Sequence, residues 1–514
     1  MSKKKFLVLA CTSIVALAAC GGGPTSTSSG GGVPSVDPYV DDTIDDVSYD
    51  GNGDIVFDNV KLKMWSVCTD PDAAYQDEII NDFNTAYKGQ IEVEIYHESR
   101  YTIFGNFAKT VSQDPNNAPD LFYGYGERIG AMVSNKLFVP MDIYLEAANI
   151  GFNKSYFEPI LIDNCYVSGY LYGLPISVDT SIAFCRKDIL TKNNLEVPYT
   201  YAELMDVCNA LVSKANAGEL WVRGNDTANV ALGNVYEWRK YDVEVEGTYY
   251  PFPISPGDMW VNAYIAQTAA LQNGGILVDE NGMPAYNTME VANGLQLLRD
   301  WLIPTETSAN NTALSKIDLN YDAGVTDFYA GTSAFYLAGA WDGYGNTARM
   351  DTMYAADGGS SNTMAIINPS ELFAADLTKD YAKHIFGDSH AVSIVKTVTS
   401  RTKRIAAAVF SNYLAENCGG VWIKAGHLPA SLVVQQSNDL YLNNEFYLKY
   451  VQYYGTTDLY RTMPVTVYYD FIMESFGTAL KKAMLSRYRE IPISQLLQES
   501  YDDCIARIRD LEEL

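Results

Sequence analysis

Residues 61–96, KLKMWSVCTDPDAAYQDEIINDFNTAYKGQIEVEIY, decide the fold. KLKMWSV (61–67) has the composition of a β-strand, and IEVEIY (91–96) alternates apolar with acidic positions, as a half-buried strand does. Between them apolar side chains recur every four residues from Tyr75 to Tyr87, which predicts one apolar face of a helix. A strand, a helix and a second strand over so short a stretch predict a βαβ unit with parallel strands.

Residues that begin and end helices stand where that prediction requires them, and strand and helix patterns continue beyond this stretch. Asp70 followed by Pro71 is a typical helix start, and Gly89 is a typical stop. A second helix is expected over 102–112, and DLFYGYG (120–126) is expected to be the next strand, running into a helix from Glu127. The first part of the chain is therefore expected to be an α/β lobe.

Length and composition limit the possible functions. The chain has 514 residues, 47% of them hydrophobic, and a net charge of −27. These values exclude wholesale disorder and fibrous proteins, and the length predicts about three domain-sized units or two large lobes. Nucleic acid is excluded as a partner because such affinity comes from Lys and Arg, and here 36 basic residues stand against 63 acidic ones.

The amino terminus has the pattern of an exported, anchored protein. KKKFLVLACTSIVALAAC (3–20) joins three lysines to an apolar run too short to span a bilayer, which predicts a signal peptide over 1–19. Its last four residues, LAAC, resemble the bacterial lipobox, so we expect Cys20 to be lipidated. Gly, Ser, Pro and acidic residues then predict a flexible linker over 20–55. The body is expected outside the cell, on the outer face of the membrane.

The remaining cysteines leave two alternatives open. Once Cys11 leaves with the signal, six cysteines besides Cys20 are scattered singly along the mature chain, without a CxxC pair. An even number in an exported protein permits disulfides, but isolated buried thiols fit this spacing as well. These six are Cys68, Cys165, Cys185, Cys208, Cys418 and Cys504.

Motifs for catalysis or metal binding are weak. The histidines, His97, His384, His390 and His427, are far apart in sequence, and none begins the HExxH pattern that places two zinc ligands on one helix face. GDSHA (387–391) lacks the second glycine of a nucleophile elbow, and neither a phosphate-binding loop nor a complete calcium loop is present. We therefore expect no catalytic residue, no metal and no cofactor. A carbohydrate-active enzyme with paired carboxylates stays open as an alternative.

Several segments taken in order resemble the extracellular solute-binding proteins of sugar ABC transporters, the maltodextrin-binding type. They begin with the strands and helix of 61–96 and continue through most of the chain. The later segments are FGNFAKTVSQDPNNAPDLFYGYGERIGAMVSNKLFVPMD, LYGLPISVDTSIAFCRKDIL, YTYAELMDVCNAL, DMWVNAYIAQTAALQNGGILVDENGMPAYNT, DFYAGTSAFYLAGAWDGYGN and ISQLLQESYDDCIARI.

The resemblance implies a two-lobed α/β fold of the periplasmic-binding-protein type (type II), with a ligand cleft between the lobes and three crossings of the chain. These crossings are expected within 174–184, 331–341 and 386–396. Lobe 1 is then expected over 56–178 plus 340–388, and lobe 2 over 179–339 plus 389–514. Residues 222–257 depart from the family pattern and are expected to form a hairpin insertion.

The resemblance also implies the function. A monomeric, lipid-anchored binding protein is expected to capture a neutral oligosaccharide by cleft closure and to deliver it to the permease subunits of an ABC importer. The 38 tyrosines favour this ligand, because Tyr combines an apolar face with a hydroxyl group and suits sugar rings. A peptide, a polyamine or ferric iron remains as an alternative ligand.

Seven residues are the expected ligand contacts. Asp70, Tyr125, Glu127 and Arg128 follow the carboxyl ends of predicted parallel strands, where open α/β sheets bind ligands. The GERIG segment (126–130) resembles the acidic and Arg pair of the maltodextrin binders, and that resemblance adds Asp179 at a crossing. It also implies stacking aromatic residues on the cleft floor, at Trp260 and Trp341.

Overall fold

The computed structural model describes residues 39–70, 72–224, 237–254, 262–304, 312–315, 321–339, 342–367, 369–417, 421–422, 425–437 and 459–513. All of them belong to the compact unit 33–514. Within the described residues, no helix is both long and apolar enough to span a membrane.

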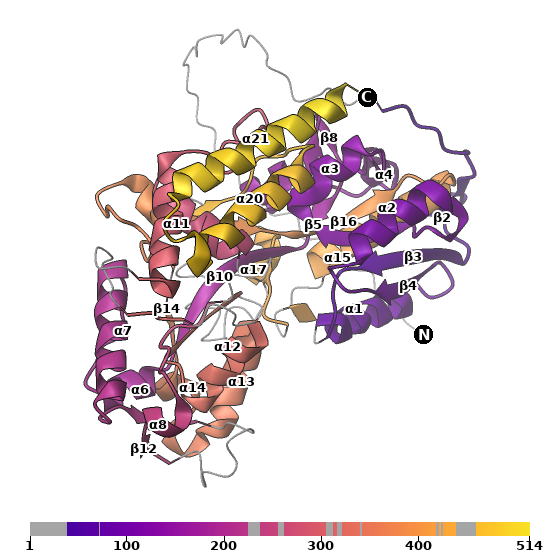
Figure 1. Cartoon of the computed structure of the whole chain (residues 1–514). Helices are drawn as coiled ribbons and strands as arrows, with labels where there is room; N and C mark the ends of the chain where they lie inside the picture. Colours follow the sequence, from indigo (N-terminus) through magenta and orange to yellow (C-terminus); the bar gives the residue numbers. More distant parts are fainter. Residues whose placement is uncertain are drawn as a thin grey trace, which may run out of the picture. The chain divides into compact units, whose positions relative to one another are not determined.

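The predicted βαβ unit is confirmed. Strand β3 (Val60–Ser66) runs parallel to β4 (Ile91–His97) and pairs with it along its whole length, and α1 (Asp72–Ala86) connects them (Figure 1). The apolar face of α1 is buried, including Ile79 and Phe83, which were expected to share it. Gly89 follows the helix with a φ of +79°, a conformation that glycine adopts without the steric cost a side chain would bring.

The first sheet has the strand order β4-β3-β5-β16-β6, and β9 pairs with β16. Strand β5 (Leu121–Tyr125) is parallel to β3, so both end at the same edge of the sheet. Its other strands are β16 (His390–Val395), β6 (Phe138–Val139) and β9 (Leu174–Pro175), and β16 runs antiparallel to β5.

The second sheet is built around β10 (Ser177–Cys185), a strand of nine buried residues. Its order is β13-β10-β15-β18, and β14 and β17 also pair with β10. These partners are β13 (Phe335–Gly339), β14 (Ala365–Ile367), β15 (Ile385–Asp388), β17 (Leu428–Pro429) and β18 (Tyr460–Arg461).

The chain passes between the two sheets at two neighbouring places. Strand β9 ends in the first sheet and β10 begins in the second, while β15 lies in the second sheet and β16 in the first. Both places fall within expected crossings, 174–184 and 386–396. At the third expected crossing, 331–341, the chain stays in the second sheet, because β13 within that segment and β14 after it both pair with β10.

The strand pairing differs from the expected lobe boundaries. Residues 340–388 were expected in lobe 1, but β14 and β15 pair with β10 in the second sheet. Residues 389–514 were expected in lobe 2, but β16 pairs with β5 and β6 in the first sheet. The reason is the direction of the crossing at 386–396. The chain passes there from β15 in the second sheet to β16 in the first, whereas the expected boundaries have it pass from the first lobe to the second.

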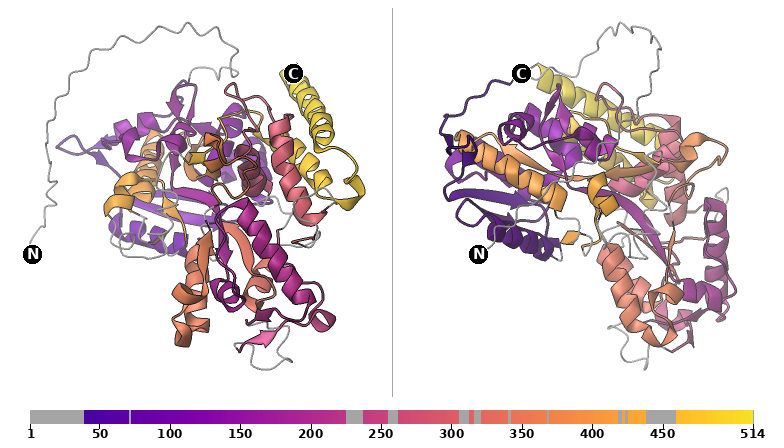
Figure 2. Two further views of the ribbon diagram at one scale, coloured as in Figure 1. Left: turned by 90° about the vertical axis from the view of Figure 1, so that its left-hand side faces the viewer. Right: turned by 180° about the vertical axis from the view of Figure 1, so that it is seen from behind.

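Helices pack on both sheets. Helix α15 packs on β3, β16 and α4, beside the indigo and purple elements in the right-hand view of Figure 2, whereas α20 packs along α21 and both contact α11. The expected hairpin insertion is visible in part, as an antiparallel pair of β11 and β12. Residues 225–236 and 255–257 of it lie outside the described residues.

The remaining elements complete the fold. Residues 39–176 hold β1 (Ser48–Tyr49), β2 (Ile55–Val56), α2 (Ile103–Gln113), η1 (Pro115–Asn117), η2 (Gly126–Arg128), α3 (Ile129–Ser134), α4 (Asp142–Ala147), η3 (Lys154–Tyr156), α5 (Pro159–Asp163), β7 (Tyr166–Val167) and β8 (Tyr170–Leu171). Residues 177–388 hold α6 (Lys187–Lys192), α7 (Tyr201–Asn216), β11 (Trp221–Val222), β12 (Arg239–Lys240), α8 (Val243–Glu246), η5 (Asn262–Ala266), α10 (Gln267–Leu271), α11 (Met289–Leu302), α12 (Tyr321–Ala330), α13 (Gly343–Met353), η7 (Ala355–Asp357), α14 (Ser360–Thr363) and η8 (Asp380–Lys383). The last part holds α15 (Arg401–Asn417), α17 (Leu432–Ser437), α20 (Tyr469–Ala483), η9 (Ser486–Tyr488) and α21 (Ile493–Glu512).

Candidate functional site

A pocket of about 190 Å³ lies where both sheets contribute residues, and we call it the cleft pocket. The first sheet supplies the segment after β3, Tyr125 at the end of β5, and His390 at the start of β16. Elements that follow β10 supply Tyr264 from η5 and Asp342 at the start of α13. The complete lining is Val67, Cys68, Thr69, Asp70, Asp72, Arg100, Tyr125, Tyr264, Asp342, His390 and His427.

The lining is polar and mainly acidic. Asp70, Asp72 and Asp342 contribute three carboxylates, against one guanidinium from Arg100. Burial raises the pKa of the Tyr125 and Tyr264 hydroxyl groups well above the usual value, so both stay neutral at physiological pH. Neutral hydroxyl groups both donate and accept hydrogen bonds, and carboxylates accept them. The pocket can therefore match a ligand that is rich in hydroxyl groups.

A buried network lies directly behind this lining and is centred on Asp179 of β10. The Nδ1 atom of His427 lies 2.7 Å from one carboxylate oxygen of Asp179, and the Nδ1 atom of His390 lies 2.8 Å from the other. Ser177 donates a hydrogen bond of 2.7 Å to Asp179, and the Nε2 atom of His427 lies 3.3 Å from Asp72. Because β10 belongs to the second sheet and β16 to the first, the network joins the two sheets.

The electrostatics of this network favour its charged form. Burial alone would lower the pKa of His427, but the carboxylates of Asp179 and Asp72 outweigh that effect and raise it to about 10. Burial would likewise raise the pKa of Asp179, but the two histidines hold it well below the usual value. At neutral pH the cluster therefore contains an ionised carboxylate beside a protonated imidazole.

The structure brings together three of the expected contact residues. Asp70 and Tyr125 line the cleft pocket, and Asp179 contacts its two histidines from behind. The Asp179 side chain is only 2% exposed, so it does not face the pocket itself. It holds the His390 and His427 side chains, which do.

The two other expected contacts on the first sheet, Glu127 and Arg128, lie elsewhere. They are not among the described residues that line the pocket, and they contact α20. Glu127 accepts a hydrogen bond from the Tyr469 hydroxyl group, and Arg128 pairs with Asp470. The Arg128 guanidinium also lies over the Phe104 ring, 4.0 Å from its centre. These contacts tie the first sheet to the C-terminal helices.

Glu127 and Asp388 form a second pair of interacting acidic groups near the crossing. The backbone N–H of Glu127 donates a hydrogen bond to the Asp388 carboxylate. Burial raises the pKa of Glu127 to about 7, although Tyr469 and Arg128 oppose the shift. Burial and the charge of Glu127 raise the pKa of Asp388 well above the usual value. Near neutral pH this pair therefore holds protons that exposed carboxyl groups would have released.

Trp260, Trp341 and Cys20 lie outside the described residues, so the expected stacking and lipidation stay predictions. Cys418 lies outside them as well, whereas the other five cysteines of the folded body are buried and unpaired.

Sequence analysis missed His390, His427, Arg100 and Tyr264 as pocket residues. The wide spacing of the histidines in sequence predicts no shared site, yet the fold brings His390 and His427 onto one carboxylate. For His390 the sequence offered one indication of a place in the cleft, because the residue lies in the expected crossing segment 386–396. For His427 no comparable local signal exists, since its position depends on where the chain returns after α15.

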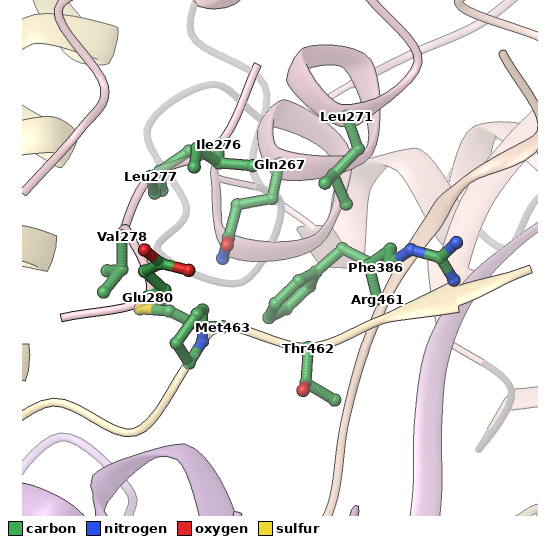
Figure 3. A pocket seen from close by; sticks show the side chains of 11 residues that line it. Gln267, Leu271, Ile276, Leu277, Val278, Glu280, Phe386, Arg461, Thr462 and Met463 are labelled. Carbon is green, nitrogen blue, oxygen red and sulfur yellow. The ribbon is translucent and has the colours of Figure 1, made fainter. Parts of the chain in front are cut away.

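A second cavity, of about 240 Å³, has a different character. Figure 3 shows Gln267 pointing into it among apolar side chains that include Leu277, Val278 and Phe386. The Nε2 atom of Gln267 has no hydrogen-bond partner within the described part of the chain. Neither the expected contact residues nor the histidine network line this cavity, so the cleft pocket is the better candidate for a polar ligand.

The fold resembles solved structures of sugar-binding proteins. One is the maltose/maltodextrin-binding domain of Bdellovibrio bacteriovorus bound to maltotriose, with a TM-score of 0.63 and 15% identity over 87% of this chain and 100% of that one. Another is the GacH receptor of Streptomyces glaucescens, studied with acarbose, with a TM-score of 0.63 and 14% identity over 87% and 97%. A third is an ABC substrate-binding protein of Listeria monocytogenes in complex with cycloalternan, with a TM-score of 0.60 and 16% identity over 88% and 99%.

These similarities establish the fold as the mixed α/β, two-lobed fold of periplasmic sugar-binding proteins, as the sequence predicted. The family model of the bacterial extracellular solute-binding proteins matches residues 78–442, which is more than half of the chain. The match includes β9, β10, β15 and β16, which form both crossings, and β5; three of these strands carry Tyr125, Asp179 and His390. The chain therefore belongs to the bacterial extracellular solute-binding protein family.

Proposed function

We propose that this protein captures a neutral oligosaccharide in the cleft pocket and delivers it to an ABC importer. The observation that carries the proposal is the pocket itself, where hydroxyl and carboxylate groups at the ends of β3 and β5 meet those of Tyr264 and Asp342 from elements that follow β10. Structures of similar fold hold maltotriose, acarbose and cycloalternan, which supports a carbohydrate ligand.

The lobes in this proposal follow the strand pairing. Lobe 1 comprises about 39–176 and 390–437, with β17 at its border pairing with β10 of the second sheet, and lobe 2 comprises 177–388 and 459–513. A ligand that touches Tyr125 from the first lobe and Tyr264 from the second stabilises the closed arrangement, and permease subunits distinguish that arrangement from the open one.

The proposal includes the remaining expectations from the sequence. The protein acts as a monomer outside the cell, anchored through Cys20, and works by binding without catalysis. Glu127, Arg128, Trp260 and Trp341 remain proposed contacts for a longer ligand that extends beyond the cleft pocket. The net negative charge of the chain disfavours nucleic acid and anionic sugars as partners, because both are negatively charged.

A polyamine is the second candidate ligand. Asp70, Asp72 and Asp342 place three carboxylates beside the Tyr125 and Tyr264 rings, and carboxylates flanked by aromatic faces suit an aliphatic cation. Ferric iron remains an alternative ligand, because the lining also brings two tyrosines, two histidines and three carboxylates together. A peptide has no comparable support from the described lining.

A ligand screen tests the proposal. Maltotriose, other neutral oligosaccharides and spermidine are added to the purified full chain, and the melting temperature is measured, because a ligand that binds the native state raises it. Isothermal calorimetry then measures the affinity of each hit. We expect an oligosaccharide to bind, and we expect Tyr125→Ala and Asp70→Ala each to weaken it by about 1 to 3 kcal/mol through unpaired polar groups.

Tyr199→Ala is the matched control, because Tyr199 is exposed and does not line the pocket. Binding of spermidine alone would favour the second candidate. Hydrolysis of the oligosaccharide during the titration would instead support the enzyme alternative.

A further inference from the structure

The network around Asp179 has the composition of a metal site. One carboxylate oxygen of Asp179 and one ring nitrogen each of His390 and His427 lie within 4.8 Å of one another. Two imidazoles and a carboxylate are a common ligand set for zinc and similar cations, with bond lengths of about 2.0 to 2.2 Å. A single cation bound to all three atoms takes the place of the proton that His427 otherwise carries, so metal binding releases that proton.

The groups around the three residues are those that a metal site needs. A histidine that binds a metal usually places its other ring nitrogen against a carboxylate, which fixes the orientation of the ring. His427 has this arrangement, because its Nδ1 atom faces Asp179 while its Nε2 atom lies 3.3 Å from Asp72. The Asp179 carboxylate is held by the Ser177 hydroxyl group at 2.7 Å. Each supporting contact keeps a metal-binding atom directed into the cluster.

Rigid elements and an access route complete the arrangement. Asp179 and His390 lie in β10 and β16, and His427 directly precedes β17. Trp422 stacks on the His427 ring with a centre-to-centre distance of 4.7 Å, which further fixes its position. His390 and His427 line the cleft pocket, so a cation can enter there and keep a coordination position open toward it.

We propose that Asp179, His390 and His427 form a binding site for a divalent transition-metal cation of the zinc type at the wall of the cleft pocket. The cation would join β10 of the second sheet to β16 of the first. This inference does not depend on which organic ligand the pocket takes.

Cobalt is a suitable probe, because Co²⁺ replaces Zn²⁺ and absorbs visible light when four or five protein and water ligands surround it. The full chain is purified without a polyhistidine tag, stripped with a chelator and titrated with Co²⁺, and Zn²⁺ binding is measured by calorimetry. We expect visible absorption bands and one Zn²⁺ per chain. His390→Gln and His427→Gln should abolish the bands, and Asp72→Asn should weaken Zn²⁺ binding about 10- to 100-fold.

His97→Gln is the matched control, since His97 lies apart from the cluster, against Asp77 and the Cys68 carbonyl group, and should leave the bands unchanged. If the buried His427→Gln variant does not fold, His390→Gln carries the test, because the His390 side chain is 13% exposed. Absence of the bands in wild type, or equal Zn²⁺ affinity in wild type and His390→Gln, overturns the inference.

Oligosaccharide is titrated into the stripped protein in parallel, to separate this inference from the proposed function. Sugar binding without any cobalt signal overturns the metal site alone. A cobalt signal without sugar binding supports the metal site and counts against the proposed function.

Discussion

At the scale of single residues, the Glu127 carboxyl group should make stability depend on pH. Its folded-state pKa is raised to about 7, so between the ordinary value of 4.5 and 7 the folded state holds a proton that the unfolded state has released. Stability should therefore fall as pH rises across that window, by a few kcal/mol in total. Glu127→Gln should be more stable than wild type at pH 8 and should flatten the decline, measured by urea denaturation at several pH values.

Glu94→Gln serves as the control, because Glu94 is an exposed carboxylate on β4. The Glu94 variant should keep the wild-type dependence on pH. An equally steep decline in Glu127→Gln would show that another group, such as Asp388, causes it.

Single residues also show what a sequence can and cannot predict about a site. Asp70 and Tyr125 were found because the carboxyl ends of parallel strands lie at one edge of a sheet, a rule that needs only local patterns. His390 and His427 were missed because their meeting depends on how β16, α15 and β17 pack. The prediction of Glu127 and Arg128 as ligand contacts rests partly on the family resemblance. In this chain both side chains contact α20, which lies far away in sequence.

At the scale of elements, the start of α6 is held by a buried ion network. Asp188 receives two hydrogen bonds of 2.9 Å from Arg186 and one of 2.8 Å from Arg223. Arg186 also donates to backbone carbonyl groups of Phe328 and Arg223, which join α6 to α12 and to the segment after β11. The network therefore fixes α6, α12 and the segment after β11 relative to one another.

Asp188→Asn should cost about 3 to 5 kcal/mol of the free energy of unfolding, because it leaves the buried Arg186 guanidinium without its counter-charge and leaves Arg223 with Asp357 alone. Urea denaturation measures the loss. The exposed pair of Lys61 and Glu92, at 3.2 Å, provides the control, and Glu92→Gln should change stability by less than about 1 kcal/mol. An Asp188→Asn variant no less stable than the control would contradict the role of the network.

Elements differ in how far the sequence predicted them. The unit β3–α1–β4 was predicted because periodicity of apolar residues reports local structure directly. The division into lobes follows less directly from the sequence, since β14, β15 and β16 are short strands whose sheet is set by distant partners. The family resemblance predicts a crossing within 386–396, and only the pairing with β10 or β5 shows to which sheet β14, β15 and β16 belong.

At the scale of the whole molecule, the predicted lipid anchor and the folded body should be separable. Cys20→Ser should release the protein from the membrane fraction, because two acyl chains provide the attachment. The purified variant should keep the wild-type melting temperature, because residue 20 lies outside the compact unit 33–514. Cell fractionation and thermal unfolding measure these two outcomes. Retention of Cys20→Ser in the membrane would contradict the predicted anchor.

The buried cysteines have a practical consequence for the molecule in solution. Cys68 is 4% exposed and lies in the wall of the cleft pocket, whereas Cys208 is fully buried in α7, away from that wall. Burial raises the pKa of both thiols, so both react slowly, but a maleimide reagent should reach Cys68 through the pocket, and saturating maltotriose should slow that reaction without protecting Cys208 to the same extent. Peptide mass spectrometry over time measures both rates. The fraction of Cys68 that stays unlabelled then reports, without any engineered probe, how much of the pocket is occupied.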